Sequence, residues 1–248
     1  MSSNNFDIPW FYEEIIDINN ENKFEFNREN LHYCKKVLRT NKNSKILIFD
    51  GYGNSKIADI SFNGKKVIFN NIKLSKTKKQ KFKFSLVQSL CEVNKLELVI
   101  QKITELGCEK LFLTNSVYSK KFDIEFLEKK LPRWKKIMAS ACAQSKNPFL
   151  PEIIFGSHNQ ICEKYQKNSA FKLICLDPKS QKIEFSNIYK YREKNIIIFI
   201  GPEGGYSNEE IMLFEKYDIE KININKYILR TETASIVGAF LAQILCNN

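Results

Sequence analysis

Short apolar runs separated by glycine turns characterise the first 76 residues. Alternating apolar and polar positions predict strands over Lys45–Asp50, Ala58–Ser61 and Lys65–Asn70. Two glycines lie in the segment Asp50–Asn54, and Asn63-Gly64 follows the second run; both are turn signals for hairpins. We therefore expect a small all-β module over residues 1–76, followed by a lysine-rich linker.

From Phe82 onward, apolar runs alternate with amphipathic segments. This alternation is typical of a mostly parallel sheet covered by helices. The predicted strands are Phe82–Gln88, Leu111–Leu113, Ile153–Phe155, Phe171–Leu176 and Ile196–Ile200. The last run has five consecutive apolar residues and predicts a strand buried on both faces. The pattern predicts an α/β domain over residues 77–248.

Apolar residues at helical spacing predict the helices of this domain. One face is formed by Leu96, Val99, Ile100, Ile103 and Leu106, and the helix ends at Gly107. A longer pattern covers Ile124–Ser145, where we expect Pro132 to separate two helices because proline lacks a backbone donor. Ser207 and Glu210 have the spacing of a capping box, which starts a helix that reaches about Lys216.

The last helix pattern is strongly apolar. Its two i+4 ridges are Ile236, Phe240 and Ile244, and Val237, Leu241 and Leu245. A stripe of this width has to be buried against the sheet or against a second subunit.

Two unusual segments stand out. One directly follows the predicted strand Ile196–Ile200, and the other directly precedes the last helix. Gly201-Pro202-Glu203-Gly204-Gly205 follows Ile196–Ile200, at the strand end where open α/β sheets bind ligands. Ile228–Ala234 immediately precedes the last helix. The glycine segment lacks the Gly-Lys-Ser/Thr ending of a phosphate loop and does not match Gly-x-Gly-x-x-Gly. A plain turn and a helix start capped by Thr231 or Thr233 remain as alternatives.

Composition narrows the class of protein. The formal charge of +11 favours a polyanionic partner, although part of the lysine excess can be a solvated compositional background. Seven cysteines without a Cys-x-x-Cys pair, and only two histidines, make a zinc site or a disulfide framework unexpected. The 248 residues contain no apolar run of a membrane span and no signal peptide, so we expect a cytoplasmic protein.

Together these segments resemble the RsmE-like family of 16S ribosomal RNA uridine-N3 methyltransferases in the SPOUT superfamily. Further matches are Lys102–Gly107, Arg133–Ser145, and His32 followed by Val37-Leu38-Arg39. The resemblance implies a trefoil-knotted methyltransferase domain over 77–248, preceded by a PUA-like β-barrel that binds RNA over 1–76. It also implies S-adenosylmethionine as cofactor, ribosomal RNA or the small ribosomal subunit as partner, and a homodimer.

The resemblance also implies the site residues. Uridine N3 carries an imide proton, so the site needs a base or a cation that stabilises the uridine anion. Arg230 is the candidate cation, and Glu232, or Glu203 in its place, is the candidate base. The implied cofactor residues are Leu176, Ile200, Gly201, Glu203, Gly204, Gly205, Ile224, Ile228, Leu229, Thr233 and Ala234. The implied RNA contacts are His32, Lys35, Lys36 and Arg39.

The chain departs from the family pattern at three positions. Asn225 replaces a glycine before Ile228; because an asparagine can still take the left-handed conformation, we expect the turn to be kept. Tyr118 and Asn147 stand where the family frequently has arginine. The alternatives are another SPOUT enzyme that acts on transfer RNA or a ribose 2′-hydroxyl, and an inactive RNA-binding assembly factor.

Overall fold

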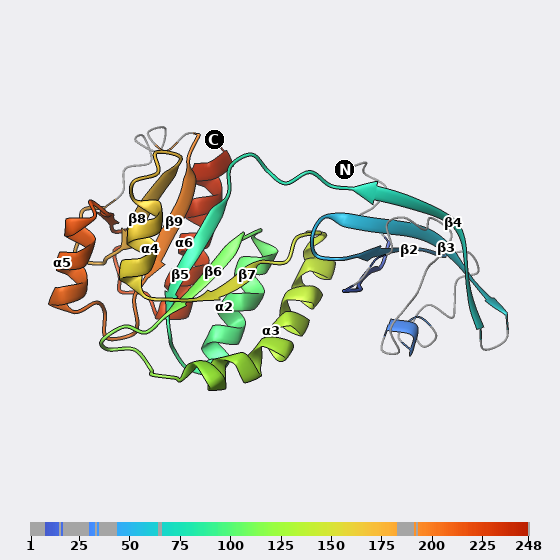
Figure 1. Cartoon of the computed structure of the whole chain (residues 1–248), viewed down its shortest axis with the longest axis horizontal. Helices are drawn as coiled ribbons and strands as arrows, with labels where there is room; N and C mark the ends of the chain where they lie inside the picture. The colour runs from blue at the N-terminus through green and yellow to red at the C-terminus, as the bar shows by residue number, and fades with distance from the viewer. Residues whose placement is uncertain are drawn as a thin grey trace. The chain divides into compact units, whose positions relative to one another are not determined.

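The structure is a computed structural model that describes residues 8–14, 16, 30–32, 34, 44–63, 66–182, 191 and 193–247. The chain divides into two compact units. One comprises Met1–Lys79 and Ala139–Leu150, and the other comprises Gln80–Met138 and Pro151–Asn248. Figure 1 shows the elements of both units coloured along the chain.

The described residues of the N-terminal unit form a four-stranded sheet in the order β1-β2-β3-β4. β1 is parallel to β2, and the other pairs are antiparallel hairpins. One face buries an apolar cluster that includes Phe11, Ile46, Ile48 and Ile60. The strands are Trp10–Tyr12, Ser44–Phe49, Asn54–Asn63 and Lys66–Lys76.

The predicted hairpins are present, with longer strands than the pattern indicated. The first turn places Gly51 and Gly53 at positive φ, +81° and +95°. The Asp50 carboxylate accepts backbone hydrogen bonds from Tyr52 and Asn54, which fixes this turn. Gly64 in the second turn lies outside the described residues.

The C-terminal unit has a parallel six-stranded sheet in its described residues, in the order β10-β8-β9-β5-β6-β7. The mostly parallel sheet predicted from the sequence is confirmed. In chain order its strands are β5 Phe84–Ser89, β6 Lys110–Thr114, β7 Glu152–Phe155, β8 Phe171–Leu176, β9 Asn195–Ile200 and β10 Glu220–Ile222.

Helices cover both faces of this sheet (Figure 1). α4 and α5 pack on a cluster that includes Val87, Phe112 and Phe199. α2 packs on α6, and α6 packs on β5 and β9. Adjacent strand residues point to opposite faces, so Gln88 faces α6 while Val87 faces α4 and α5. The helices are α2 Val93–Glu105, α3 Ile124–Ser145, α4 His158–Tyr165, α5 Asn208–Lys216 and α6 Thr231–Asn247.

The prediction that Pro132 separates two helices is wrong. α3 is one continuous helix with Pro132 inside it. Proline removes one hydrogen bond of the ladder, but the buried side chains of Leu127, Trp134 and Met138 lie on both sides of it. Packing of this apolar face compensates for the missing donor.

Other predicted details agree with the structure. Gly107 follows α2 at φ +83°, and Ser207 and Glu210 form the predicted capping box of α5. All seven cysteines are buried with free thiols. None of the helices that the structure describes is long and apolar enough to cross a membrane.

Candidate active site

The glycine loop connects β9 to α5. Gly205 has a φ of +75°, which favours glycine, and its N–H donates to the Pro202 carbonyl at 2.9 Å. A Cβ on Gly204 would lie 2.9 Å from the Tyr118 Cβ. Glycine is therefore required at 205 by the backbone conformation and at 204 by the close approach of Tyr118.

A buried polar network joins the glycine loop to the start of α6. The Thr231 hydroxyl donates to the Gly201 carbonyl at 2.8 Å and accepts from the Gln88 side-chain amide at 3.1 Å. The Ser235 hydroxyl hydrogen-bonds the Gln88 side-chain oxygen and the Thr231 carbonyl. The side chains of Gln88, Thr231 and Ser235 are all buried. The two motifs singled out from the sequence therefore meet at the carboxyl ends of β5 and β9.

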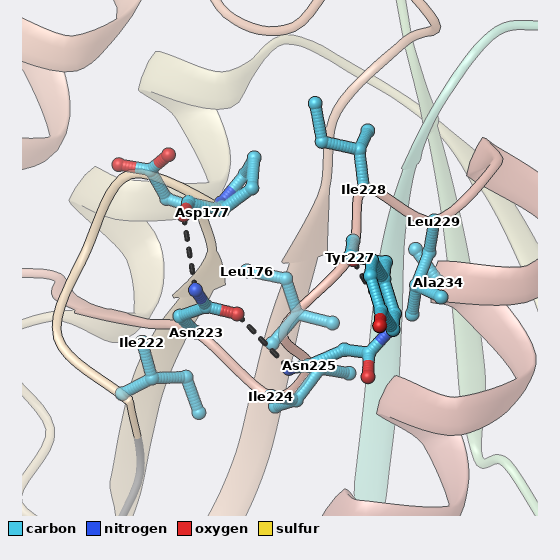
Figure 2. A pocket seen from close by; sticks show the side chains of 11 residues that line it. Leu176, Asp177, Ile222, Asn223, Ile224, Asn225, Tyr227, Ile228, Leu229 and Ala234 are labelled. Atoms are coloured by element: carbon cyan, nitrogen blue, oxygen red, sulfur yellow. Dashed lines mark hydrogen bonds between the residues drawn. The ribbon is translucent and has the colours of Figure 1, made fainter.

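A pocket opens beside this junction, at the carboxyl ends of β8 and β10. We call it the Leu229 pocket; its empty volume is about 370 Å³, part of it open to solvent. Figure 2 shows Leu176, Ile224, Leu229 and Ala234 around it. Its lining residues are Leu176, Asp177, Pro178, Ile222, Asn223, Ile224, Asn225, Tyr227, Ile228, Leu229 and Ala234.

Two asparagines shape one wall of this pocket (Figure 2). Asn223 donates from its amide to the Pro178 carbonyl at 3.0 Å and accepts from the Asn225 N–H at 2.9 Å. Asn225 in turn donates to the Tyr227 carbonyl at 3.1 Å. Asn225 does not use the left-handed conformation that asparagine can take, since its φ is not positive. Side-chain hydrogen bonds hold the turn in place of that conformation.

Five of the predicted cofactor residues line the Leu229 pocket: Leu176, Ile224, Ile228, Leu229 and Ala234. The others lie elsewhere. Ile200 is buried against Gly238 of α6. A Cβ at position 238 would lie 3.2 Å from the Ile200 Cδ1 atom. Gly201, Gly204 and Gly205 belong to the loop itself, and Thr233 is exposed on α6.

Glu203 lines a further pocket, which we call the Tyr118 pocket. It lies between the segments Leu90–Glu92, Tyr118–Lys120 and Pro202-Glu203, with an empty volume of about 420 Å³ that includes open solvent. Lys95, in the first turn of α2, forms an ion pair with Glu203. This pair links α2 to the glycine loop.

Arg230 and Glu232 carry charge near the Tyr118 pocket. The hydrogen bond and charge of Lys95 lower the pKa of Glu203, and Lys120 and Arg230 add to this effect. Arg230 is exposed, and its guanidinium forms no hydrogen bond or ion pair within the described part of the chain. It is therefore available to an external anion.

The Glu232 carboxylate faces the same region. Its Oε2 atom is buried without a hydrogen-bond partner among the described residues. Burial raises the pKa of Cys91 to about 12, and the negative charge of Glu232 contributes. Glu232 also helps Glu203 to raise the pKa of Lys95. The segment 228–234 thus lines the Leu229 pocket with Leu229 and Ala234, and the charge of its Glu232 acts on Cys91 in the wall of the Tyr118 pocket.

The predicted RNA contacts lie in the N-terminal unit. His32 is exposed. Lys35, Lys36 and Arg39 fall outside the described residues. In the described part of the chain, no group of three or more His, Cys, Asp or Glu residues is placed to hold a metal ion.

The sequence reasoning missed Gln88, Ser235 and Lys95. Gln88 and Ser235 could have been noticed as polar residues at apolar positions of a buried strand and a helix, because buried polar groups need partners. No feature of the sequence indicated a role for Lys95, because a lysine in the first turn of a helix is ordinarily solvated.

Comparisons with known proteins agree with this architecture. Residues 78–243 match a family described as an RNA methyltransferase domain. A ribosomal RNA small subunit methyltransferase E from Buchnera aphidicola is 34% identical over 96% of this chain and 94% of its own length. A protein of the same description from Mesomycoplasma hyopneumoniae is 29% identical over 91% and 96%.

Solved structures show the same fold. The ribosomal RNA small subunit methyltransferase E from Neisseria gonorrhoeae, bound to S-adenosyl methionine, has a TM-score of 0.80 at 23% identity. That match covers 96% of this chain and 98% of the other. A methyltransferase from Legionella pneumophila, in complex with the same cofactor, has a TM-score of 0.79 at 24% identity, over 96% and 97% of the two chains. The fold and the family match define an RNA methyltransferase. The chain belongs to this family and, within it, to the ribosomal RNA small subunit methyltransferases E.

Proposed function

We propose that this protein transfers a methyl group from S-adenosylmethionine to N3 of a uridine in 16S ribosomal RNA. The observation that carries the proposal is the hydrogen bond of Thr231 to Gly201. It joins the segment whose Leu229 and Ala234 line the Leu229 pocket to the glycine loop whose Pro202 and Glu203 line the Tyr118 pocket. Relatives described as ribosomal RNA small subunit methyltransferases E support the substrate. Such a substrate implies a cytoplasmic enzyme.

The Leu229 pocket suits S-adenosylmethionine. Its lining is mostly apolar with a few polar groups, as is usual for small-molecule sites. Leu176, Ile224 and Leu229 offer apolar surface to an adenine ring, and the carboxylate of Asp177 at the rim suits a cationic group. When bound, the cofactor supplies a methyl group made electrophilic by its sulfonium.

The polar residues between the pockets suit the other half of the reaction. Uridine N3 becomes nucleophilic when its imide proton leaves, and the unpartnered Oε2 of Glu232 can accept that proton. The anion then carries its charge on the carbonyl oxygens beside N3. The guanidinium of Arg230 can stabilise this charge through two parallel N–H donors. Bound S-adenosylmethionine would supply the methyl group that this anion takes up at N3.

The finer architecture belongs to the same proposal. We infer a PUA-like barrel over 1–76 that binds RNA, supported by the hairpins β2–β3 and β3–β4 and by the net charge of +11. We also infer a trefoil knot within 77–248, supported by the contact of Thr231 with Gly201.

A homodimer is part of the proposal as well. α2 and α6 pack together, and they expose Leu98, Val237 and Phe240 by 41%, 40% and 52%. Apolar side chains of this size favour burial against a second copy of the chain. Light scattering tests this inference: a mass of 58 kDa is twice the 29.0 kDa of the chain, and a monomer mass contradicts it.

The reaction is tested with purified protein, methyl-labelled cofactor and isolated small ribosomal subunits or their RNA. Nucleosides from the product are separated and identified by mass spectrometry. N3-methyluridine is the expected product. A methyl label on ribose, or methyl transfer only to transfer RNA, would support another SPOUT enzyme. The absence of any methyl transfer would support the inactive RNA-binding factor. Lys129→Ala, which removes an exposed ion pair with Glu125 on α3, is compared with the wild type to show that the preparation tolerates substitution.

A further inference from the structure

We propose that the Tyr118 pocket receives the target base of the RNA, a uracil turned out of its stack, with the Tyr118 ring as its stacking surface. This inference rests on the proposed function, because it assigns the second substrate of the same site. The pocket is formed by Leu90–Glu92, Tyr118–Lys120 and Pro202-Glu203.

The position of the pocket is the first argument. The reacting base has to reach the Arg230–Ala234 segment from a side that the cofactor leaves open. Leu229 and Ala234 of this segment line the other pocket. Pro202 and Glu203 of the Tyr118 pocket directly follow Gly201, whose carbonyl accepts a hydrogen bond from Thr231, the neighbour of Glu232. A base held in the Tyr118 pocket therefore lies beside the segment that carries the proposed proton acceptor.

The shape and chemistry of the lining are the second argument. Leu90 and Pro202 provide apolar surface, and the Tyr118 side chain, 59% exposed, offers a free ring face. The Lys95 ammonium, paired with Glu203 of the wall, can donate to a uracil carbonyl. The Ser119 hydroxyl donates to the Ser116 carbonyl at 3.0 Å and so holds the loop. A flat ring with two carbonyl acceptors fits such a mixed lining. Enzymes that modify the pairing edge of a base take it out of the stack and hold it against aromatic or apolar side chains.

The third argument is that the loop carrying Tyr118 is held in place. The Glu210 carboxylate accepts from the Ser116 hydroxyl and from the Val117 N–H at 3.3 Å. Glu210 also caps α5 directly after the glycine loop, accepting from the Ser207 N–H at 2.9 Å. One buried carboxylate therefore ties two walls of the pocket together. Contact of Tyr118 with Gly204 fixes them further.

Lys120 completes the assignment. Its side chain is exposed beside Tyr118 and has no hydrogen bond or ion pair among the described residues. A base can leave its stack only if the backbone on either side is held. We assign Lys120 to a phosphate next to the target nucleotide, since phosphate contacts position an RNA without reading its sequence.

The first test compares Tyr118→Ala with Tyr118→Phe in the full chain. Single-turnover methyl transfer to small-subunit RNA is measured at saturating cofactor, and cofactor affinity is measured by calorimetry. We expect Tyr118→Ala to lower kcat/KM for RNA by about 5- to 150-fold, the range that base–aromatic stacking spans. We expect Tyr118→Phe to stay within about 3-fold and both variants to keep the cofactor Kd. An unchanged rate in Tyr118→Ala, or an equal loss of cofactor binding, would overturn the proposal.

The second test measures the salt dependence of RNA binding. Lys120→Ala should weaken binding and reduce the slope of log K against log salt by about 1, while Tyr118→Ala should leave that slope unchanged. A slope that does not change in Lys120→Ala would overturn the phosphate contact.

The third test separates this inference from the proposed function. Small-subunit RNA that contains 4-thiouridine is photo-crosslinked to the wild-type protein, and the modified peptide is identified by mass spectrometry. A crosslink within Tyr118–Lys120 supports the pocket whether or not methyl transfer occurs. Crosslinks confined to other parts of the chain overturn the pocket even if N3-methyluridine forms. A wild type that binds RNA and cofactor without transferring a methyl group would instead refute the proposed function.

Discussion

At the scale of single residues, the site depends on polar groups left without an internal partner. Arg230 has no ion pair in the described residues, although Glu203 is close enough for its pKa to respond to it. Glu232 keeps a buried oxygen without a hydrogen bond. Leaving the buried Glu232 oxygen unpaired costs folding free energy, which an enzyme accepts where a substrate supplies the missing partner. The sequence motif predicted these residues. Only the structure shows that their polar atoms have no hydrogen-bond or ion-pair partner among the described residues.

The role of Arg230 predicts a defined kinetic effect. Arg230→Ala should lower the single-turnover rate by about 10²- to 10³-fold, the usual effect of removing one donor to a developing oxyanion, while the cofactor Kd is unchanged. Arg230→Lys should recover only part of the rate because it lacks the planar fork. Glu232→Gln should also slow the chemical step. Arg133→Ala, which removes an exposed pair with Glu97 on another part of the unit, is the matched control. Equal rates in all variants would contradict the assignment.

His158 predicts how stability depends on pH. It is buried, its Nε2 lies 2.9 Å from the Thr114 hydroxyl and its Nδ1 lies 3.5 Å from Glu210. Burial lowers the pKa of His158 below 6.5, and the Glu210 charge opposes this shift. The unfolded state therefore binds a proton at a higher pH than the folded state. The free energy of unfolding should decrease as the pH falls below about 6.5. Urea titrations should show a weaker decrease in His158→Asn, and an identical pH profile would refute this account.

At the scale of elements, apolar patterns predicted most of the parallel sheet. Runs such as Ile196–Ile200 are unambiguous because few polar residues interrupt them. The short helix α4 and the three-residue strand β10 were not predicted, since segments of this length have too few apolar positions to show a period. The continuity of α3 across Pro132 was also missed. Local preference could not predict it, because tertiary packing supports the helix on both sides of the proline.

The junction between β5, β9 and α6 predicts a stability effect. Thr231→Val keeps the side-chain shape but removes the hydroxyl that joins Gly201 and Gln88. Two buried polar groups then lose a partner, which should lower the free energy of unfolding by about 1–3 kcal/mol. Thr233→Val is the matched control, because Thr233 lies two residues away on the exposed side of the helix. Denaturant unfolding measures both variants, and equal stability would show that the network does not support the junction.

At the scale of the whole molecule, the chain combines two units whose residues interleave along the sequence. Ala139–Leu150, within the α/β half of the sequence, belongs to the N-terminal unit, where Cys142 packs with Trp10, Leu47 and Phe49. Chain order alone could not indicate this, because the apolar positions of a helix do not identify their partners. Removal of the first 76 residues would expose this surface, so the RNA-binding role of the N-terminal unit is better examined by substitutions in the full chain.

The central claim is that the protein methylates uridine at N3 in small-subunit ribosomal RNA. The most direct measurement compares the ribosomal RNA nucleosides of cells that carry the wild-type protein, no protein, or the Arg230→Ala variant at equal abundance. Mass spectrometry should find N3-methyluridine in 16S ribosomal RNA only with the wild type, and at a strongly reduced level with the variant. Unchanged N3-methyluridine without the protein, or the loss of a different modified nucleoside, would contradict the account.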